Sequence, residues 1–232
     1  QMPPLYAFYL YLIYIIQAGK DIVYHESSFF ITSVLFSHAI LASISVAVFF
    51  IICRNFFSER LSIFCALIFS IFPVHVFACS QISSVSLQLF LTILFIYIFL
   101  KITKNPNFLN IFYFSLISAL LLLLRGEFLI LFFIAILYLS YVFKLDFKKN
   151  ILILFLVFIV ISPYLVRNIM IFDTVTITKS FGYNLWRGNN PDTVVEGIHC
   201  CDGNSIVAEE LAKIPKDKFY EINMDDFFRL LT

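Results

Sequence analysis

The stretch FFITSVLFSHAILASISVAVFFIIC, residues 29–53, decides the fold, because its 25 residues include no Asp, Glu, Lys or Arg. As a helix it extends about 37 Å, enough to cross the roughly 30 Å hydrocarbon core of a bilayer. The rest of the chain is similar: 61% of the 232 residues are hydrophobic, 13% are charged, and the mean hydropathy is +0.95. We therefore predict an all-α polytopic integral membrane protein.

The charge balance and the cysteines exclude several classes of protein. With 16 Lys+Arg against 15 Asp+Glu the net charge is +1, so nothing indicates nucleic-acid binding or an acidic disordered tail. The five cysteines form no CxxC or Cys/His pattern, so we predict neither a zinc site nor a disulfide framework. Each of the four histidines, at positions 25, 38, 75 and 199, is interpreted as a polar residue at a helix end or in a loop rather than a metal ligand.

The apolar runs predict about six transmembrane helices. They are Phe29 to Cys53, Leu61 to Cys79, Val85 to Leu100, Phe108 to Leu124, Phe128 to Phe143 and Ile151 to Phe172. The first run of the chain, Leu5 to Ile16, would be only about 18 Å long and is predicted to be an interfacial or re-entrant helix. One helix over residues 108–143 would reach about 54 Å, so Arg125-Gly126-Glu127 is predicted to be a break between two helices.

The basic residues of the short loops predict the orientation. Seven lie on one side of the predicted membrane: Arg54, Arg60, Lys101, Lys104, Lys144, Lys148 and Lys149. The other side has only Lys20 and Arg125. The positive-inside rule makes the first side cytoplasmic. We expect a bacterial inner membrane protein whose tail from about Asp173 lies in the periplasm.

The chain divides into two predicted parts. Residues 1–172 form the membrane core, with Pro163 expected to kink or end the last helix near its outer end. Residues 173–232 are rich in Gly, Asn, Asp, Glu and Lys and are expected to form a mixed extracytoplasmic domain, with a short extended segment at Thr174 to Thr178. Because residue 1 is Gln and the chain stops inside an amphipathic segment, we expect it to be a piece of a longer protein.

Arg125 and Glu127 are the only charged residues between Lys104 and Lys144. A charge beside the hydrocarbon core costs several kcal/mol unless it is paired or reaches the headgroups. One interpretation is an Arg-Glu pair that neutralises itself in a tight turn. The other is an anion site in the outer leaflet, since the planar guanidinium suits a phosphate and Gly126 allows close backbone approach. Glu127 would then orient Arg125.

Two further segments are candidates for ligand contacts. Arg167 and Asn168 emerge at the interface level predicted for Arg125, where an Arg can also simply reach to headgroups. Residues 180–191, SFGYNLWRGNNP, contain the only Trp with three Asn and two Gly. Carboxamides beside an aromatic face suit a sugar ring, although Gly and Asn-Pro are also ordinary turn formers. The side chains concerned are Tyr183, Asn184, Trp186, Asn189 and Asn190.

Several of these segments, in this order, resemble one family. The matching pieces are Pro3-Pro4-Leu5-Tyr6, Arg54-Asn55-Phe56-Phe57, Leu124-Arg125-Gly126-Glu127, Pro163-Tyr164-Leu165-Val166-Arg167-Asn168 and Gly182-Tyr183-Asn184-Leu185-Trp186-Arg187-Gly188-Asn189-Asn190-Pro191. Together they resemble the C-type membrane glycosyltransferases of family 39, which includes protein O-mannosyltransferases and the aminoarabinose transferases of lipid A. The resemblance implies a polyprenyl-phosphate-linked sugar as donor and a catalytic carboxylate upstream of Gln1.

The expected function is sugar transfer to a glycan, lipid or protein acceptor on the outer face. Arg125, Glu127 and Arg167 are the candidates for the donor phosphate, and Asn168 with the residues of the 180–191 motif for the sugar or acceptor. A divalent metal cofactor stays open. The alternatives are a lipid or solute transporter or flippase and a non-catalytic membrane scaffold. A transporter is expected to carry ionisable groups or broken helices near the midplane, and apart from the Arg125 turn the sequence shows almost none.

Overall fold

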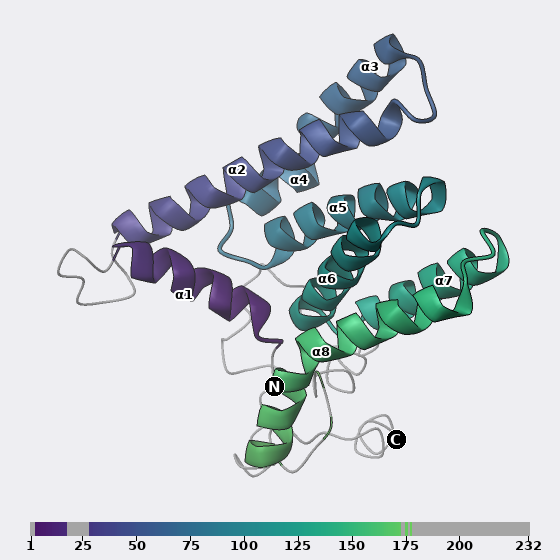
Figure 1. The fold of residues 1–232 in the computed structure, drawn as a ribbon. Helices are drawn as coiled ribbons and strands as arrows, with labels where there is room; N and C mark the ends of the chain where they lie inside the picture. Colours follow the sequence, from purple (N-terminus) through teal and green to yellow (C-terminus); the bar gives the residue numbers. More distant parts are fainter. Residues whose placement is uncertain (1–2, 18–27, 173–174, 176, 178–232) are drawn as a thin grey trace, which may run out of the picture.

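The computed structural model describes residues 3–17, 28–172, 175 and 177. Within these residues the chain is entirely helical, without a strand (Figure 1). The helices are α1 (Leu5–Gln17), α2 (Ser28–Cys53), α3 (Glu59–Ser70), α4 (Pro73–Cys79), α5 (Val85–Lys104), α6 (Phe108–Leu124), α7 (Phe128–Tyr141) and α8 (Phe147–Phe172). The predicted all-α class is therefore confirmed for this part, and the predicted domain at 173–232 lies almost wholly outside the described residues.

Three of these helices are long and apolar enough to cross a membrane: α2, α5 and α8. The bent pair α3 and α4 would make a fourth if it counts as one span. The helices α6 and α7 have 17 and 14 residues and are shorter than an ordinary span. The described helices thus indicate an integral membrane protein, and the number of six spans stays a prediction.

Helix α6 forms the centre of the bundle, with α5 and α8 packed on it and α2 packed on α5. It is apolar all round, which is typical of a helix buried on several sides. The side chains of Phe114, Leu121 and Leu122 are almost completely buried, and the Phe114 ring lies 5.1 Å from that of Phe95 in α5. This packing determines where the two ends of α6 lie relative to α5.

The helix ends sort into two groups (Figure 1). Helices α2, α5 and α7 end on the side where α3, α6 and α8 begin (Figure 1). These helix ends and the connections between them carry the seven basic residues of the predicted cytoplasmic side. We call this side the basic end. At the opposite end, α1 extends between the beginning of α2 and the end of α6, the position expected of an interfacial helix.

Proline residues shape two of the helices. The predicted span from Leu61 to Cys79 is not continuous, because α3 and α4 meet at a 53° bend. Phe72 has an extended backbone, as expected before Pro73, whose ring excludes a helical conformation at the preceding residue. Pro163 lies inside α8 and leaves the helix continuous, and α8 bends strongly along its length (Figure 1).

Candidate functional site

The predicted break between two helices at residues 125–127 is present. Helix α6 stops because Arg125 has an extended backbone, with φ −151° and ψ 121°. Its N–H still donates to the carbonyl of Leu121 at 2.8 Å, and its own carbonyl accepts from the N–H of Phe128 at 3.2 Å. These hydrogen bonds close a tight turn that carries Arg125 and Glu127 to the end of the bundle opposite the basic end (Figure 1).

Arg125 and Glu127 form an ion pair, with 3.0 Å between Nη1 and Oε1. Their side chains are 41% and 64% exposed. The self-neutralising turn is thus observed as a contact. However, an ion pair this exposed contributes about 1 kcal/mol or less, and Arg125 has further N–H groups directed elsewhere. The pair can therefore be opened by a ligand that binds the guanidinium more strongly than one carboxylate does.

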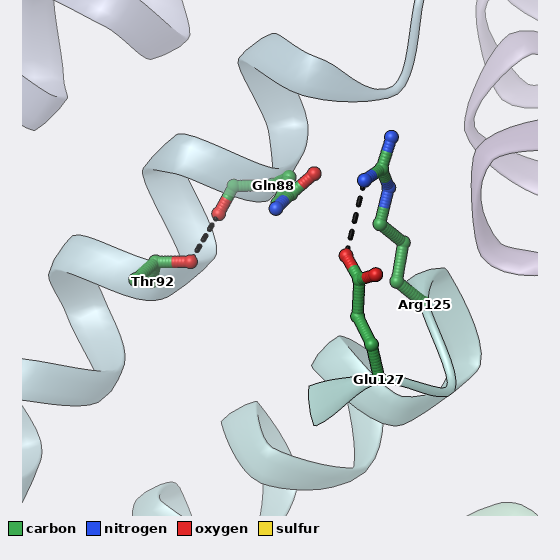
Figure 2. A network of polar contacts seen from close by, with 4 residues as sticks. All are labelled: Gln88, Thr92, Arg125 and Glu127. Carbon is green, nitrogen blue, oxygen red and sulfur yellow. Dashed lines mark hydrogen bonds and ion pairs between the residues drawn. The ribbon is translucent and has the colours of Figure 1, made fainter. Parts of the chain in front are cut away.

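Gln88 of α5 is a third member of this site that the sequence analysis missed. Figure 2 shows its carboxamide pointing from α5 towards the Arg125–Glu127 pair. One turn further on, the Thr92 hydroxyl donates to the backbone carbonyl of Gln88 at 2.7 Å. The signal in the sequence is that Gln88 is the only carboxamide between residues 85 and 104, a stretch that is otherwise mostly apolar.

Arg167 and Asn168 lie in the last turns of α8, a helix that begins at the basic end (Figure 1). Arg167 is exposed and donates from Nη1 to Oδ1 of Asn168 at 3.1 Å, while the Asn168 side chain is completely buried. Asn168 therefore anchors the Arg167 side chain on the protein surface. The tail candidates Tyr183, Asn184, Trp186, Asn189 and Asn190 lie outside the described residues.

His38 corrects the interpretation of the histidines. It lies neither at a helix end nor in a loop but well inside α2, where its side chain is fully buried. The rings of Tyr9 and Tyr6 from α1 pack beside it at 5.9 and 6.2 Å between centroids. The Tyr9 hydroxyl is hydrogen-bonded to that of Ser37. A histidine in the uninterrupted apolar run 29–53 was the signal for a buried polar group.

In this cluster the buried Tyr6 hydroxyl has no hydrogen-bond partner among the described residues, and the buried His38 imidazole lies within reach of the Gln81 backbone. Burial, with the neighbouring Tyr9 as a smaller cause, raises the pKa of the Tyr6 hydroxyl to about 12. Tyr6 is therefore protonated at neutral pH and keeps a donor without an acceptor. Leaving such a group unpaired costs about 1–3 kcal/mol.

His75 is the other histidine within the described residues. It is buried near the beginning of α4 and stacks on Phe69 of α3, with 4.8 Å between ring centroids. This stack joins α3 to α4 across the bend between them. Among the described residues no three His, Cys, Asp or Glu side chains come together as metal ligands.

Comparisons with protein-family models, curated proteins and solved structures find no match for this chain. The family resemblance therefore stays a prediction based on the quoted motifs.

Proposed function

We propose that the protein is an integral membrane glycosyltransferase that moves a sugar from a polyprenyl-phosphate donor to an acceptor on the outer face of a bacterial inner membrane. The observation that carries the proposal is the Arg125–Glu127 turn, with Gln88 directed towards it, at the end of the bundle opposite the basic end. If the basic end is cytoplasmic, as the positive-inside rule predicts, this turn lies at the headgroup depth of the outer leaflet.

Arg125 is the group proposed to bind the donor phosphate. Charge-assisted hydrogen bonds from a guanidinium to phosphate are roughly twice as strong as neutral ones and are often bidentate. The exposed contact with Glu127 opposes them by about 1 kcal/mol or less, so phosphate binding prevails. Glu127 can keep one N–H of Arg125 and orient the others, and the Gln88 carboxamide can donate to a phosphate or sugar oxygen.

In the proposed reaction an acceptor hydroxyl attacks the anomeric carbon of the sugar. The bond from that carbon to the phosphate oxygen breaks, and the polyprenyl phosphate leaves with the electron pair. The hydroxyl proton passes to a carboxylate, which the family resemblance puts upstream of Gln1. Arg125 offsets the charge that develops on the phosphate. Arg167 is proposed to bind the donor phosphate with Arg125. The residues proposed to contact the donor sugar or the acceptor are Asn168, Tyr183, Asn184, Trp186, Asn189 and Asn190.

The test is transfer of labelled sugar from polyprenyl phosphate by the purified full-length protein at saturating acceptor. We expect Arg125→Ala to lower the rate about a hundredfold or more, the usual cost of removing one well-placed electrostatic group. Arg125→Lys keeps the charge without the planar fork and should retain partial activity. Arg60→Ala, which removes an exposed arginine at the basic end, is the matched control. Wild-type rates in a folded Arg125→Ala protein would refute the phosphate site.

A transporter or flippase is the second candidate, because the structure adds two features that the sequence analysis did not find. One is the 53° break between α3 and α4, and the other is the fully buried His38. Broken helices and intramembrane ionisable groups are typical of transporters. In vesicles holding the protein, movement of labelled polyprenyl phosphate between leaflets without sugar transfer, abolished in His38→Ala but not in Arg125→Ala, would favour this function. A scaffold would show neither activity.

A further inference from the structure

The ends of α2 and α5 form a second polar site at the basic end. The two helices run in the same direction and pack along each other, so their C-terminal ends lie together (Figure 1). Lys104, the last residue of α5, donates from Nζ to Oδ1 of Asn55, just beyond the end of α2, at 2.5 Å. This contact joins the end of α5 to the turn between α2 and α3.

The cations of this site are held by uncharged partners. The guanidinium carbon of Arg54 lies 5.9 Å from the centre of the Phe50 ring, and the Lys101 ammonium lies 4.7 Å from the centre of the Tyr97 ring. The ion pair found among the described residues is that of Arg125 and Glu127, at the opposite end of the bundle. None of the cations at this site therefore forms an ion pair with a described carboxylate.

The charge left at this site is clearly positive. Two helices end here, α2 and α5, and two begin, α3 and α6, so the partial charges of their backbone dipoles largely cancel. The side chains supply four positive charges, from Arg54, Arg60, Lys101 and Lys104, and one negative charge, from Glu59, which leaves +3. Lys104 contacts Asn55, and Arg54 precedes Asn55 in the chain, so an anion bound at this turn would offset part of the positive charge.

The neighbouring aromatic side chains identify the kind of anion. Phe56 and Phe57 follow Asn55 in the α2–α3 turn and are 64% and 49% exposed. Two exposed phenylalanine rings beside the end of an apolar helix suit acyl chains at the membrane interface, whereas a soluble phosphate would make no use of them. A ligand that satisfies both the cations and the rings carries a phosphate and hydrocarbon chains.

We propose that the turn between α2 and α3, with the end of α5, is a binding site for an anionic phospholipid of the leaflet at the basic end. The phosphate is held by Arg54 and Lys104 beside the Asn55 carboxamide, and the acyl chains pack against Phe56 and Phe57. The site is separate from the Arg125 turn and does not depend on the proposed sugar transfer.

Native mass spectrometry of the full-length protein in detergent, titrated with phosphatidylglycerol or phosphatidylcholine, tests the site. We expect the wild type to bind phosphatidylglycerol preferentially and the double variant Arg54→Gln/Lys104→Gln to bind it about 30-fold more weakly, the effect of losing two interfacial cations. The matched control Lys148→Gln/Lys149→Gln removes the same charge at the beginning of α8 and should change binding less than about threefold. Equal losses in both variants, or no lipid preference in the wild type, would overturn the proposal.

Two further measurements separate a lipid from a soluble phosphate and a binding defect from misfolding. Phe56→Ala/Phe57→Ala should weaken phosphatidylglycerol binding, and millimolar glycerol 3-phosphate should not displace the lipid. Displacement by glycerol 3-phosphate, or full binding in the phenylalanine variant, would also overturn the assignment. The thermal unfolding midpoint of every variant in phosphatidylcholine alone should match that of the wild type. A double variant that unfolds at a lower temperature is replaced by Arg54→Lys/Lys104→Met.

Discussion

The ring of Tyr9 in α1 lies nearly parallel to that of His38 in α2, with 5.9 Å between centroids and 10° between planes. Since His38 is fully buried, this stack is part of the protein interior, although α1 has just 13 residues and is too short to span. Isolated helices of this length are marginally stable. The stack on His38 therefore contributes to holding α1 across the end of the bundle.

Replacing His38 tests whether its buried imidazole destabilises the protein. We expect His38→Phe to raise the thermal unfolding midpoint by a few degrees, because it keeps a ring beside Tyr9 and removes the buried polar atoms. His38→Ala should lower the midpoint, since it leaves a cavity. If His38→Phe is as unstable as His38→Ala, the imidazole has a polar partner that supports it, and the transporter function gains weight.

Glu127 and Gln88 should have graded effects on sugar transfer. Glu127→Gln keeps a weaker hydrogen bond to Arg125 and is expected to lower the rate less than Arg125→Ala does. Gln88→Leu removes the carboxamide directed at the pair and should raise KM for the donor more than it lowers kcat. The reason is that the uncharged carboxamide is proposed to bind the donor and does not offset the charge that develops in the reaction. Thr92→Val in the same helix is the control, and a defect as large as that of Gln88→Leu would mean a packing effect.

The orientation can be tested by labelling single cysteines in a cysteine-free protein in intact cells. Cysteines introduced at Lys104 and Lys148 should be shielded from an impermeant thiol reagent, because both lie at the basic end. A cysteine introduced at Asn190 should be labelled. After permeabilisation all three should react. Labelling of position 148 without position 190 would invert the topology and remove the outer-face site.

A native cysteine pair can report the packing of α2 on α3. Cys53 is the last residue of α2, and Cys65 lies in α3, which packs against α2. Mild oxidation with copper phenanthroline should form a disulfide between Cys53 and Cys65. The number of thiols that react with a thiol reagent should then fall by two. The Cys79 thiol, which contacts the carbonyl of His75 at 3.2 Å in its own helix, should stay unpaired in the Cys53→Ser control. Failure to cross-link would contradict the α2–α3 hairpin.

The Arg125 turn shows how far the sequence could predict the site. The length limit on a helix and the isolated charges predicted the break, and the structure confirms it. The contact between Arg125 and Glu127 is local, because the two residues are close in sequence and lie in one tight turn. The approach of Gln88 could not be predicted, because it depends on how α5 packs on α6, between residues 37 positions apart in the chain.

Length, hydropathy and the position of basic residues are properties of each segment alone, and they determined the all-α class, most helix boundaries and the grouping of the basic loops at one end. The tertiary structure decided which helix faces point inwards. In helices such as α2 the lipid-facing and protein-facing sides are equally apolar, so no period in the sequence distinguishes them. That is why the burial of His38 against Tyr6 and Tyr9, and the approach of Gln88 to Arg125, emerge only when the helices pack.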